Sequence, residues 1–342
     1  MNLHIPIFDG HNDTLLRLFA SKHNDSFFES SQGHIDLARA RAGGFAGGFF
    51  AVFVPSAPDE QPANDDDFPE QLPFAYALET SLAMTALLFR IEAQSAGQMR
   101  VARTIDDIEH GIRTNTLSAI LHFEGADAID PEFHTLEVLY RAGLRSLGIV
   151  GSRPNAFGWG VPFRFPHTPD IGPGLTEAGR ELVRICNHLG IMIDLSHLNE
   201  AGFWDVARLS SAPLVATHSN AYALCPSPRN LTDRQLDAIR ESDGMVGVNF
   251  HVGFLRRDGR SDAATPLDAV AEHVIYLVER LGIDRVGFGS DFDGALMPHE
   301  LGDVAGLPRL LETLRRHGFD EASLRKLAHE NWVRVLKKTW RR

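Results

Sequence analysis

The chain has 342 residues, of which 44% are hydrophobic, enough to bury a core in one large α/β barrel or two modest domains. Its formal net charge of −12 argues against a nucleic-acid or anionic-membrane partner, since those partners select clustered Lys and Arg. Two cysteines, no signal-peptide pattern and no apolar run of about 18 residues lead us to expect a cytoplasmic protein without disulfides or a membrane span.

Apolar runs recur along the chain and alternate with amphipathic stretches. The runs predict parallel strands covered on both faces, and the stretches between them, such as 175–190, 199–211, 231–242 and 266–282, predict helices. Strand then helix, eight times, indicates the α/β class and a (β/α)₈ TIM barrel. The predicted strands are 4–8, 45–54, 117–123, 144–150, 190–195, 213–217, 244–250 and 284–290.

Two segments interrupt this alternation. Residues 55–73 are acidic and proline-rich, which is typical of a solvated insertion. Residues 151–175 form a long loop rich in Gly, Pro and aromatic residues, and we expect it to be a wall or lid of the active site. No repeat or linker is evident, so we expect one catalytic domain over residues 1–342.

Polar residues follow most of the predicted strands, at the barrel face where chemistry gathers in this fold. His11 and Asp13 are two positions apart, so both side chains leave on the same face if the strand geometry continues. Alone, this pair fits a polar turn as well as a metal site. The full set of candidates is His11, Asp13, Glu124, His197, His218 and Asp291.

Three histidines and two carboxylates among these candidates suit a borderline divalent cation such as zinc. Four protein ligands would fill the coordination sphere of one tetrahedral zinc ion, but a catalytic zinc needs an open position for water or substrate. Two ions that share a bridging carboxylate therefore fit these ligands better than one ion does. No lysine occurs between Lys22 and Lys326 to act as a carboxylated bridge, which leaves Glu124. His122, two residues earlier, is a competing ligand or an orienting neighbour.

The motifs "DGHND", "HFEGADAI", "DLSH", "THSNAYALCPSPRN" and "VGFGSDFDG" occur in this order over nearly the whole chain. With them the chain resembles the membrane dipeptidase (renal dipeptidase) family of metallopeptidases. The resemblance implies a distorted (β/α)₈ barrel with two Zn²⁺, bridged by Glu124 and a water or hydroxide, that hydrolyses dipeptides and commonly accepts a D-residue at the C-terminal position. It also implies a homodimer.

The resemblance further assigns individual residues. His11, Asp13 and Glu124 would hold one ion, and Glu124, His197 and His218 the other. Arg229 matches an arginine that contacts the substrate, and Asp291 matches the acid of the last motif.

The chain departs from the family pattern at one place. Gly151 stands where the family usually carries a histidine that contacts the substrate or the developing oxyanion. Either another donor of this loop, such as Arg153, Asn155 or Trp159, does that work, or the substrate differs from a simple dipeptide.

We therefore expect a zinc-dependent dipeptidase that cleaves L-Xaa-D-Xaa or L-Xaa-L-Xaa dipeptides. Asp291 would move the proton, with Asp293 the less favoured alternative, and Arg229 would bind a free carboxylate. Two other readings stay open: a related binuclear-metal amidohydrolase acting on another small amide or lactam, and a metal-binding barrel without turnover.

Overall fold

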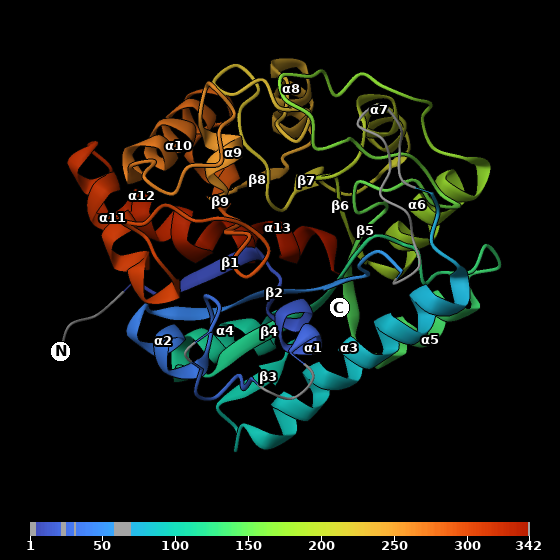
Figure 1. Ribbon diagram of the computed structural model, residues 1–342, viewed down its shortest axis with the longest axis horizontal. Helices are drawn as coiled ribbons and strands as arrows, with labels where there is room; N and C mark the ends of the chain where they lie inside the picture. The colour runs from blue at the N-terminus through green and yellow to red at the C-terminus, as the bar shows by residue number, and fades with distance from the viewer. Residues whose placement is uncertain (1–4, 22–24, 31, 58–69, 341–342) are drawn as a thin grey trace.

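The computed structural model describes residues 5–21, 25–30, 32–57 and 70–340, and its centre is a closed barrel of parallel strands (Figure 1). The strands are hydrogen-bonded in the order β2-β1-β9-β8-β7-β6-β5-β4, and pairing of β2 with β4 closes the ring. This confirms the predicted (β/α)₈ barrel. The barrel strands are β1 (Ile7–Asn12), β2 (Phe45–Phe53), β4 (Leu117–Glu124), β5 (Leu144–Gly148), β6 (Met192–Asp194), β7 (Val215–Ala216), β8 (Met245–Val248) and β9 (Val286–Phe288).

Each predicted run overlaps one of these strands, with two differences. The first strand continues to Asn12, beyond the predicted end at residue 8, while residue 4 lies outside the described residues. A short strand, β3 (Met99–Val101), was not predicted; it pairs only with Leu117–Ala119 at the start of β4. Three residues with a central exposed Arg100 are too few to stand out as an apolar run.

Helices surround the barrel (Figure 1), and the four amphipathic stretches predicted above form α6, α7, α8 and α10. Two of them, α6 and α7, begin after side-chain caps: Thr176 accepts a hydrogen bond from Gly179 N, and Asn199 accepts one from Gly202 N. The α-helices are α1 (Thr14–Ala20), α2 (Leu37–Ala42), α3 (Phe74–Gln94), α4 (Ile105–Thr114), α5 (His134–Ala142), α6 (Glu177–Leu189), α7 (Glu200–Leu209), α8 (Asp233–Glu241), α9 (Val252–Leu255), α10 (Leu267–Leu281), α11 (Leu307–Arg316), α12 (Glu321–Arg325) and α13 (Asn331–Thr339). Shorter helical turns cover Ile283–Arg285, Val304–Gly306 and Lys326–Glu330.

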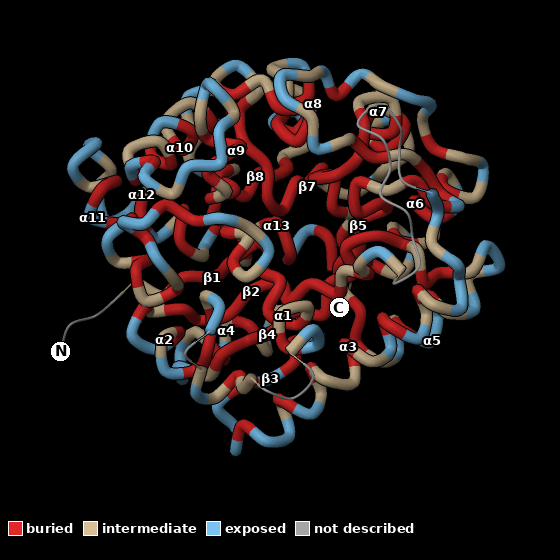
Figure 2. Tube along the Cα trace, viewed as in Figure 1, coloured by how far each residue is buried: buried red, intermediate tan, exposed pale blue. Residues whose placement is uncertain are grey.

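The barrel interior is filled by side chains, and the strands are buried while the outer loops are exposed (Figure 2). Trp332 at the start of α13 is fully buried and donates a hydrogen bond from Nε1 to Phe288 O at 3.0 Å. A Cβ at Gly10 would lie 2.4 Å from the Trp332 ring, and one at Gly247 3.0 Å from it. Glycine at these two strand positions therefore makes room for the indole inside the barrel.

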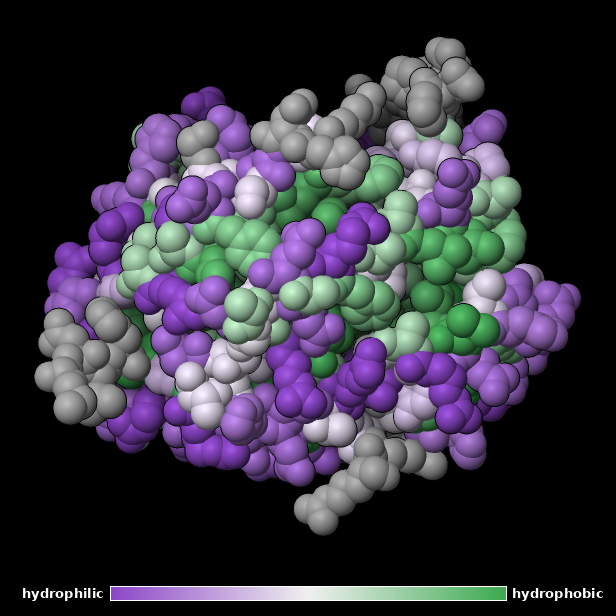
Figure 3. Space-filling view, turned by 90° about the horizontal axis from the view of Figure 1, so that it is seen from below, coloured by the Kyte–Doolittle hydropathy of each residue, from purple (hydrophilic) through white to green (hydrophobic). Residues whose placement is uncertain are grey.

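In the described part of the chain, α3 is long and apolar enough to cross a bilayer by length and composition. Glu79 and Arg90 lie among its apolar residues, so it is not a continuous apolar run of about 18 residues. One face of α3 packs on α1, β2 and β3, as in a core helix. Its other face leaves Phe74 and Leu82 exposed, and Figure 3, seen from this side, shows apolar residues gathered across the middle of the surface.

The two predicted insertions differ in how much of them is described. Residues 58–69 of the acidic segment lie outside the described residues. The loop of residues 151–175 is described throughout and is attached to the rim of the barrel: Gly160 forms a β-bridge with Leu198, and Val161 N donates to His197 O at 3.1 Å.

Candidate metal centre and active site

The six polar residues predicted from the strand ends lie around one rim of the barrel. They come from five different strands or the residues just after them, so the barrel closure brings together positions up to 280 residues apart. They are His11 in β1, Glu124 at the end of β4, and Asp13, His197, His218 and Asp291, each within three residues after a strand.

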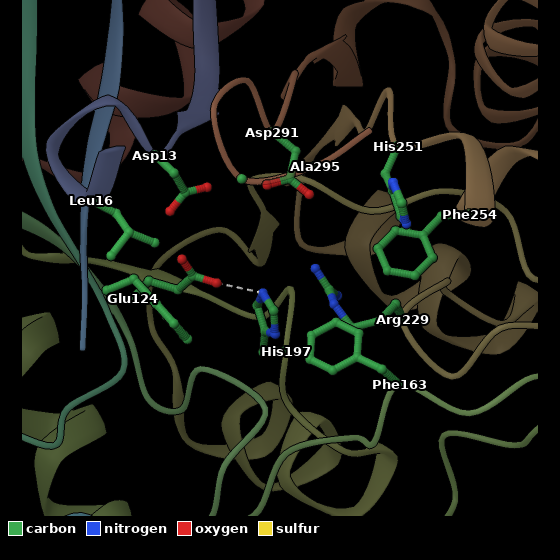
Figure 4. Close-up of a pocket in the computed structure, with 12 residues that line it drawn as sticks. Asp13, Leu16, Glu124, Phe163, His197, Arg229, His251, Phe254, Asp291 and Ala295 are labelled. Atoms are coloured by element: carbon green, nitrogen blue, oxygen red, sulfur yellow. Dashed lines mark ion pairs between the residues drawn. The ribbon is translucent and has the colours of Figure 1, made fainter. Parts of the chain in front are cut away.

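The carboxylate of Glu124 lies between Asp13 and His197 (Figure 4). Its Oε2 lies 3.3 Å from His11 Nε2, which is also 3.3 Å from Asp13 Oδ2. Its Oε1 lies 2.7 Å from His197 Nε2 and 4.0 Å from His218 Nε2, and these two imidazole nitrogens are 3.0 Å apart. One carboxylate oxygen thus faces the pair His11 and Asp13, and the other faces the pair His197 and His218.

The chemistry of these donors fits divalent metal ions. His11 is fully buried, and its Nδ1 has no hydrogen-bond partner among the described residues, while its Nε2 faces the carboxylates of Asp13 and Glu124. The ligand atoms of His11, Glu124 and His218 all lie within 4.8 Å of one another. Imidazole nitrogens and carboxylate oxygens at these positions would hold the metal.

The protonation states of the histidines differ. Burial alone would lower the pKa of His11, but the carboxylates of Glu124 and Asp13 outweigh it and hold this pKa well above its usual value. Burial would raise the pKa of Glu124, yet the charge of His11 keeps it well below its usual value. Burial lowers the pKa values of His197 and His218, which leaves both neutral and ready to bind metal.

The tautomer of His218 follows from its neighbours. Thr217 Oγ1 donates its proton to Asp194 Oδ2 at 2.6 Å. Thr217 Oγ1 must therefore be the acceptor in its second contact, with the N–H of His218 Nδ1 at 2.8 Å. Asp194 is held in turn by Ser196 Oγ and by Thr217 N. This chain of hydrogen bonds leaves the lone pair on His218 Nε2, which lies 3.0 Å from His197 Nε2 and 4.0 Å from Glu124 Oε1.

His197 is oriented by a residue that the sequence analysis did not single out. Its Nδ1 lies 2.7 Å from Ser152 Oγ in the loop after β5. Ser152 has φ of 66°, a left-handed conformation that is uncommon outside glycine. The sequence held no signal for this contact because it depends on the path of the loop.

His122, the competing candidate, lies deeper in the barrel. Its Nδ1 is 2.9 Å from Ser146 Oγ, and its ring meets His11 edge-on with centroids 5.5 Å apart. Burial lowers its pKa to about 4. His122 can also be grouped with His11 and Asp194 as three potential ligands within 4.8 Å of one another.

Asp291 lies opposite Glu124 in the pocket and points toward its centre (Figure 4). Its Oδ2 accepts a hydrogen bond of 2.9 Å from Asn249 Nδ2, and its backbone N donates to His11 O at 3.0 Å. Asp293 is engaged elsewhere: its carboxylate accepts from Thr14 Oγ1 and forms an ion pair with Arg17. The placement therefore favours Asp291 over Asp293 for contact with a substrate.

Arg229 is almost fully buried, with 2% of its surface exposed. Its Nη2 donates to His218 O at 3.4 Å, while Nε and Nη1 have no hydrogen-bond partner among the described residues. The guanidinium carbon lies 5.5 Å from the centre of the Phe254 ring. A buried guanidinium with unused donors at the edge of a pocket is suited to bind a carboxylate.

The three candidates in the loop after β5 lie apart from the pocket lining. Arg153 donates to Glu70 O and Ser56 Oγ, on the other insertion. Asn155 is buried and binds Ile149 O and Phe157 N, which fixes the loop. Gly151 packs against the backbone of Glu124, where a Cβ would lie 2.9 Å from Glu124 O. A substrate contact by any of the three stays a prediction.

The cluster opens into a pocket of about 300 Å³ (Figure 4). Several of its residues were not predicted, although His251 directly follows the predicted strand 244–250 and could have been found by the same rule as the ligands. The lining residues are Asp13, Leu16, Phe53, Glu124, Phe163, His197, Arg229, His251, Phe254, Asp291, Gly294 and Ala295.

The family model for membrane dipeptidase (peptidase family M19) matches residues 1–341. The chain belongs to this family. A crystal structure of a metallo peptidase from Rhodobacter sphaeroides, liganded with a phosphinate mimic of the dipeptide L-Ala-D-Ala, is 51% identical to the chain with a TM-score of 0.94. The match covers 98% of this chain and 99% of that one.

Two relatives extend the comparison. An uncharacterised protein in the pqqA 5′ region of Klebsiella pneumoniae is 52% identical over 255 residues, which are 75% of this chain and 94% of the relative. Dipeptidase tcpJ of Claviceps purpurea (strain 20.1) is 30% identical over 337 residues, 96% of this chain and 76% of the relative. As a member of the membrane dipeptidase family, the chain is a metallopeptidase-type hydrolase, and the rim cluster offers the ligands for its metal cofactor.

Proposed function

We propose that the protein is a zinc-dependent dipeptidase with two Zn²⁺ per chain that hydrolyses L-Xaa-D-Xaa or L-Xaa-L-Xaa dipeptides. The observation that carries this proposal is the position of Glu124, with one oxygen toward His11 and the other toward His197. A carboxylate shared in this way is what a two-metal site requires. The L-Ala-D-Ala mimic in the similar Rhodobacter sphaeroides enzyme supports the substrate class.

The chemistry divides between the metals and the chain's own side chains. When bound, two divalent ions supply an activated water at neutral pH and polarise the scissile carbonyl. Asp291 accepts the proton of the attacking water as the new C–O bond forms, and returns it to the leaving amine as the C–N bond breaks. Asn249 holds Oδ2 of Asp291, so Oδ1 is the oxygen left to carry the proton.

Arg229 explains why the substrate would be as short as a dipeptide. Its buried guanidinium, which forms no ion pair with a described residue, would pair through its planar fork with a free C-terminal carboxylate. A longer substrate would have to bury an amide there, leaving the guanidinium without a counter-charge. A pocket of about 300 Å³ matches a small substrate.

Gly151 favours a second candidate, hydrolysis of another small amide or lactam. A glycine supplies no side-chain donor for the oxyanion that forms during attack, and Arg153 and Asn155 are bound to other partners. An amide with a better leaving group or a strained ring would need less help at that position. Cytoplasmic location and a homodimer complete the proposal, supported by the composition and the family resemblance respectively.

The deciding experiment measures metal content by mass spectrometry together with amine release from a dipeptide panel. We expect about two zinc ions per chain, cleavage that a chelator abolishes, and poor cleavage of the same dipeptides with an amidated C-terminus. Cleavage of lactams but not dipeptides would establish the second candidate, and two metals without any turnover would indicate a barrel that only binds metal.

A further inference from the structure

Two aromatic rings form one wall of the pocket mouth, on the side of Arg229 (Figure 4). The rings of Phe163 and Phe254 are nearly parallel, 13° apart, with centroids separated by 6.4 Å. Phe163 also meets the His197 ring at 6.2 Å. Phe254 is 9% exposed, whereas Phe163 is 70% exposed although it lines the pocket. The mouth therefore presents an exposed apolar ring that a bound ligand could cover.

The loop that carries Phe163 is attached on both sides of this residue. Before it, Val161 N donates to His197 O at 3.1 Å. After it, His167 N donates to Pro226 O at 3.1 Å, and the Phe165 ring packs so closely on Gly259 that a Cβ there would lie 2.3 Å from it. Phe163 is thus held over the pocket by fixed neighbours, and its exposure is not that of a loose surface side chain.

The position of Arg229 indicates which part of a substrate would meet this wall. Its guanidinium carbon lies 5.5 Å from the centre of the Phe254 ring. A carboxylate paired with Arg229 places the adjoining Cα beside Phe254, so the side chain on that Cα extends along Phe254 toward Phe163. Leu16 lies across the pocket, next to Asp13 and Glu124 (Figure 4), where the other residue of a dipeptide would sit.

The wall offers no partner for a charged substrate side chain. His251 packs edge-on against Phe254 with centroids 4.6 Å apart, and burial lowers its pKa, so it is neutral at neutral pH. Arg229 would already be paired with the main-chain carboxylate. The rings offer neither a hydrogen-bond acceptor for a Lys side chain nor a donor for an Asp side chain, so burying either charge against them would cost free energy.

We propose that Phe163 and Phe254 select an apolar side chain on the residue that carries the free carboxylate, with Phe163 lying over it. This inference rests on the proposed dipeptidase function, because it uses the carboxylate anchor. Binding would cover the exposed face of Phe163, and the gain would grow with the apolar surface of the terminal side chain.

The test compares terminal residues within one substrate series. We would measure kcat/KM for L-Ala-Gly and for L-Ala followed by D- or L-Ala, Leu, Phe, Lys and Asp, on the zinc-loaded enzyme. The measured quantity is the ratio of kcat/KM for the Leu-terminated to the Gly-terminated dipeptide, since the fraction of folded protein cancels from it. The variants are Phe163→Ala and, as a matched control, Phe74→Ala, an exposed phenylalanine of α3 outside the pocket.

We expect this ratio to be about tenfold or more in the natural protein and to fall about tenfold in Phe163→Ala. Phe163→Leu should retain most of it, and Phe74→Ala all of it. An unchanged ratio in Phe163→Ala, or a preference for Lys or Asp at the terminal position, overturns the proposal.

A binding measurement separates failure of this inference from failure of the proposed function. Calorimetry with phosphinate analogues of L-Ala-Gly and L-Ala-D-Leu reports selection without turnover. If no dipeptide is cleaved but the Leu analogue binds more tightly and Phe163→Ala removes the difference, the wall is confirmed and the dipeptidase proposal is wrong. If dipeptides are cleaved and both analogues bind equally, the dipeptidase proposal is confirmed and the selection by Phe163 and Phe254 is wrong.

Discussion

Asn249 donates a hydrogen bond of 2.9 Å from Nδ2 to Oδ2 of Asp291, and so joins the residue after β8 to the loop after β9. Asn249 is fully buried, and its Oδ1 accepts a hydrogen bond of 2.7 Å from His251 N, so the amide cannot turn without losing a partner. Asp291 itself has φ of 63°, a strained backbone conformation for a residue other than glycine. The carboxylate is thus held from two sides.

Replacing Asn249 by Ala tests whether this hydrogen bond positions Asp291. We expect kcat to fall about ten- to a hundredfold while KM and zinc content stay close to those of the natural protein, because only the direction of the carboxylate changes. The melting temperature separates a folding defect from a positioning defect. A variant that keeps full kcat would show that Asp291 needs no support from Asn249.

Replacing Asp291 by Asn tests the proton transfer. The amide keeps the shape of the side chain but cannot accept the proton, so we expect kcat to fall by about 10² to 10⁴ with both metals retained. Mass spectrometry of the purified variant checks the second part. Asp291 can also be grouped with His11 and Asp13 as three potential ligands, so loss of one metal would instead assign it to the metal site. Full activity would exclude the proposed role altogether.

The barrel and most of the rim cluster could be predicted because both follow from local rules. Parallel strands buried on both faces give apolar runs, and the fold places the residues after them on one face. This rule identified His197 and His218 from sequence alone. It did not identify β3, whose three residues pair only with the start of β4 and include an exposed arginine.

What could not be predicted depends on contacts between distant segments. Ser152 reaches His197 only because the backbone turns into a left-handed conformation there. Arg153 was a candidate by its place in the sequence, but its side chain binds the segment around Ser56. Phe254 lines the pocket from a four-residue helix that no periodicity reveals. Side-chain direction in irregular segments is set by tertiary packing, which the sequence pattern does not carry.

Replacing Arg229 by Lys tests recognition of the free carboxylate. Lysine keeps the charge but loses the planar fork, so we expect KM for dipeptides to rise about tenfold or more, which corresponds to about 1.4 kcal/mol or more, with a smaller change in kcat. The variant should also discriminate less between a dipeptide and its amide. Arg240→Lys on the exposed side of α8 is the matched control and should leave both quantities unchanged. Equal KM values in Arg229→Lys would contradict carboxylate binding at this residue.

The raised pKa of His11 predicts how metal binding and stability depend on pH. The carboxylates of Glu124 and Asp13 outweigh burial and raise this pKa, so His11 carries a proton at neutral pH in the metal-free protein. A metal ligand must be the neutral imidazole, so zinc binding must displace that proton. Burial also raises the pKa of Asp13, to about 8, so this carboxyl group is largely protonated at pH 7 as well. We therefore expect zinc affinity to increase with pH, and protons to be released from His11 and Asp13 when zinc binds at pH 7.

Calorimetric titration of the metal-free protein with zinc, in two buffers of different ionisation enthalpy, counts the released protons. In Glu124→Gln the main cause of the raised pKa is removed, so fewer protons should be released for each zinc ion bound.

The raised pKa of His11 also makes the stability of the metal-free protein depend on pH. The protonated His11 stabilises the folded state fully below about pH 6.5, the pKa in the unfolded chain, and this contribution is lost as the pH rises through the raised pKa of the folded state. The melting temperature should therefore decline on the alkaline side. Zinc binding without proton release, together with a melting temperature independent of pH above 6.5, would contradict the prediction. It would show that His11 is already neutral in the metal-free protein and that Glu124 and Asp13 do not raise its pKa.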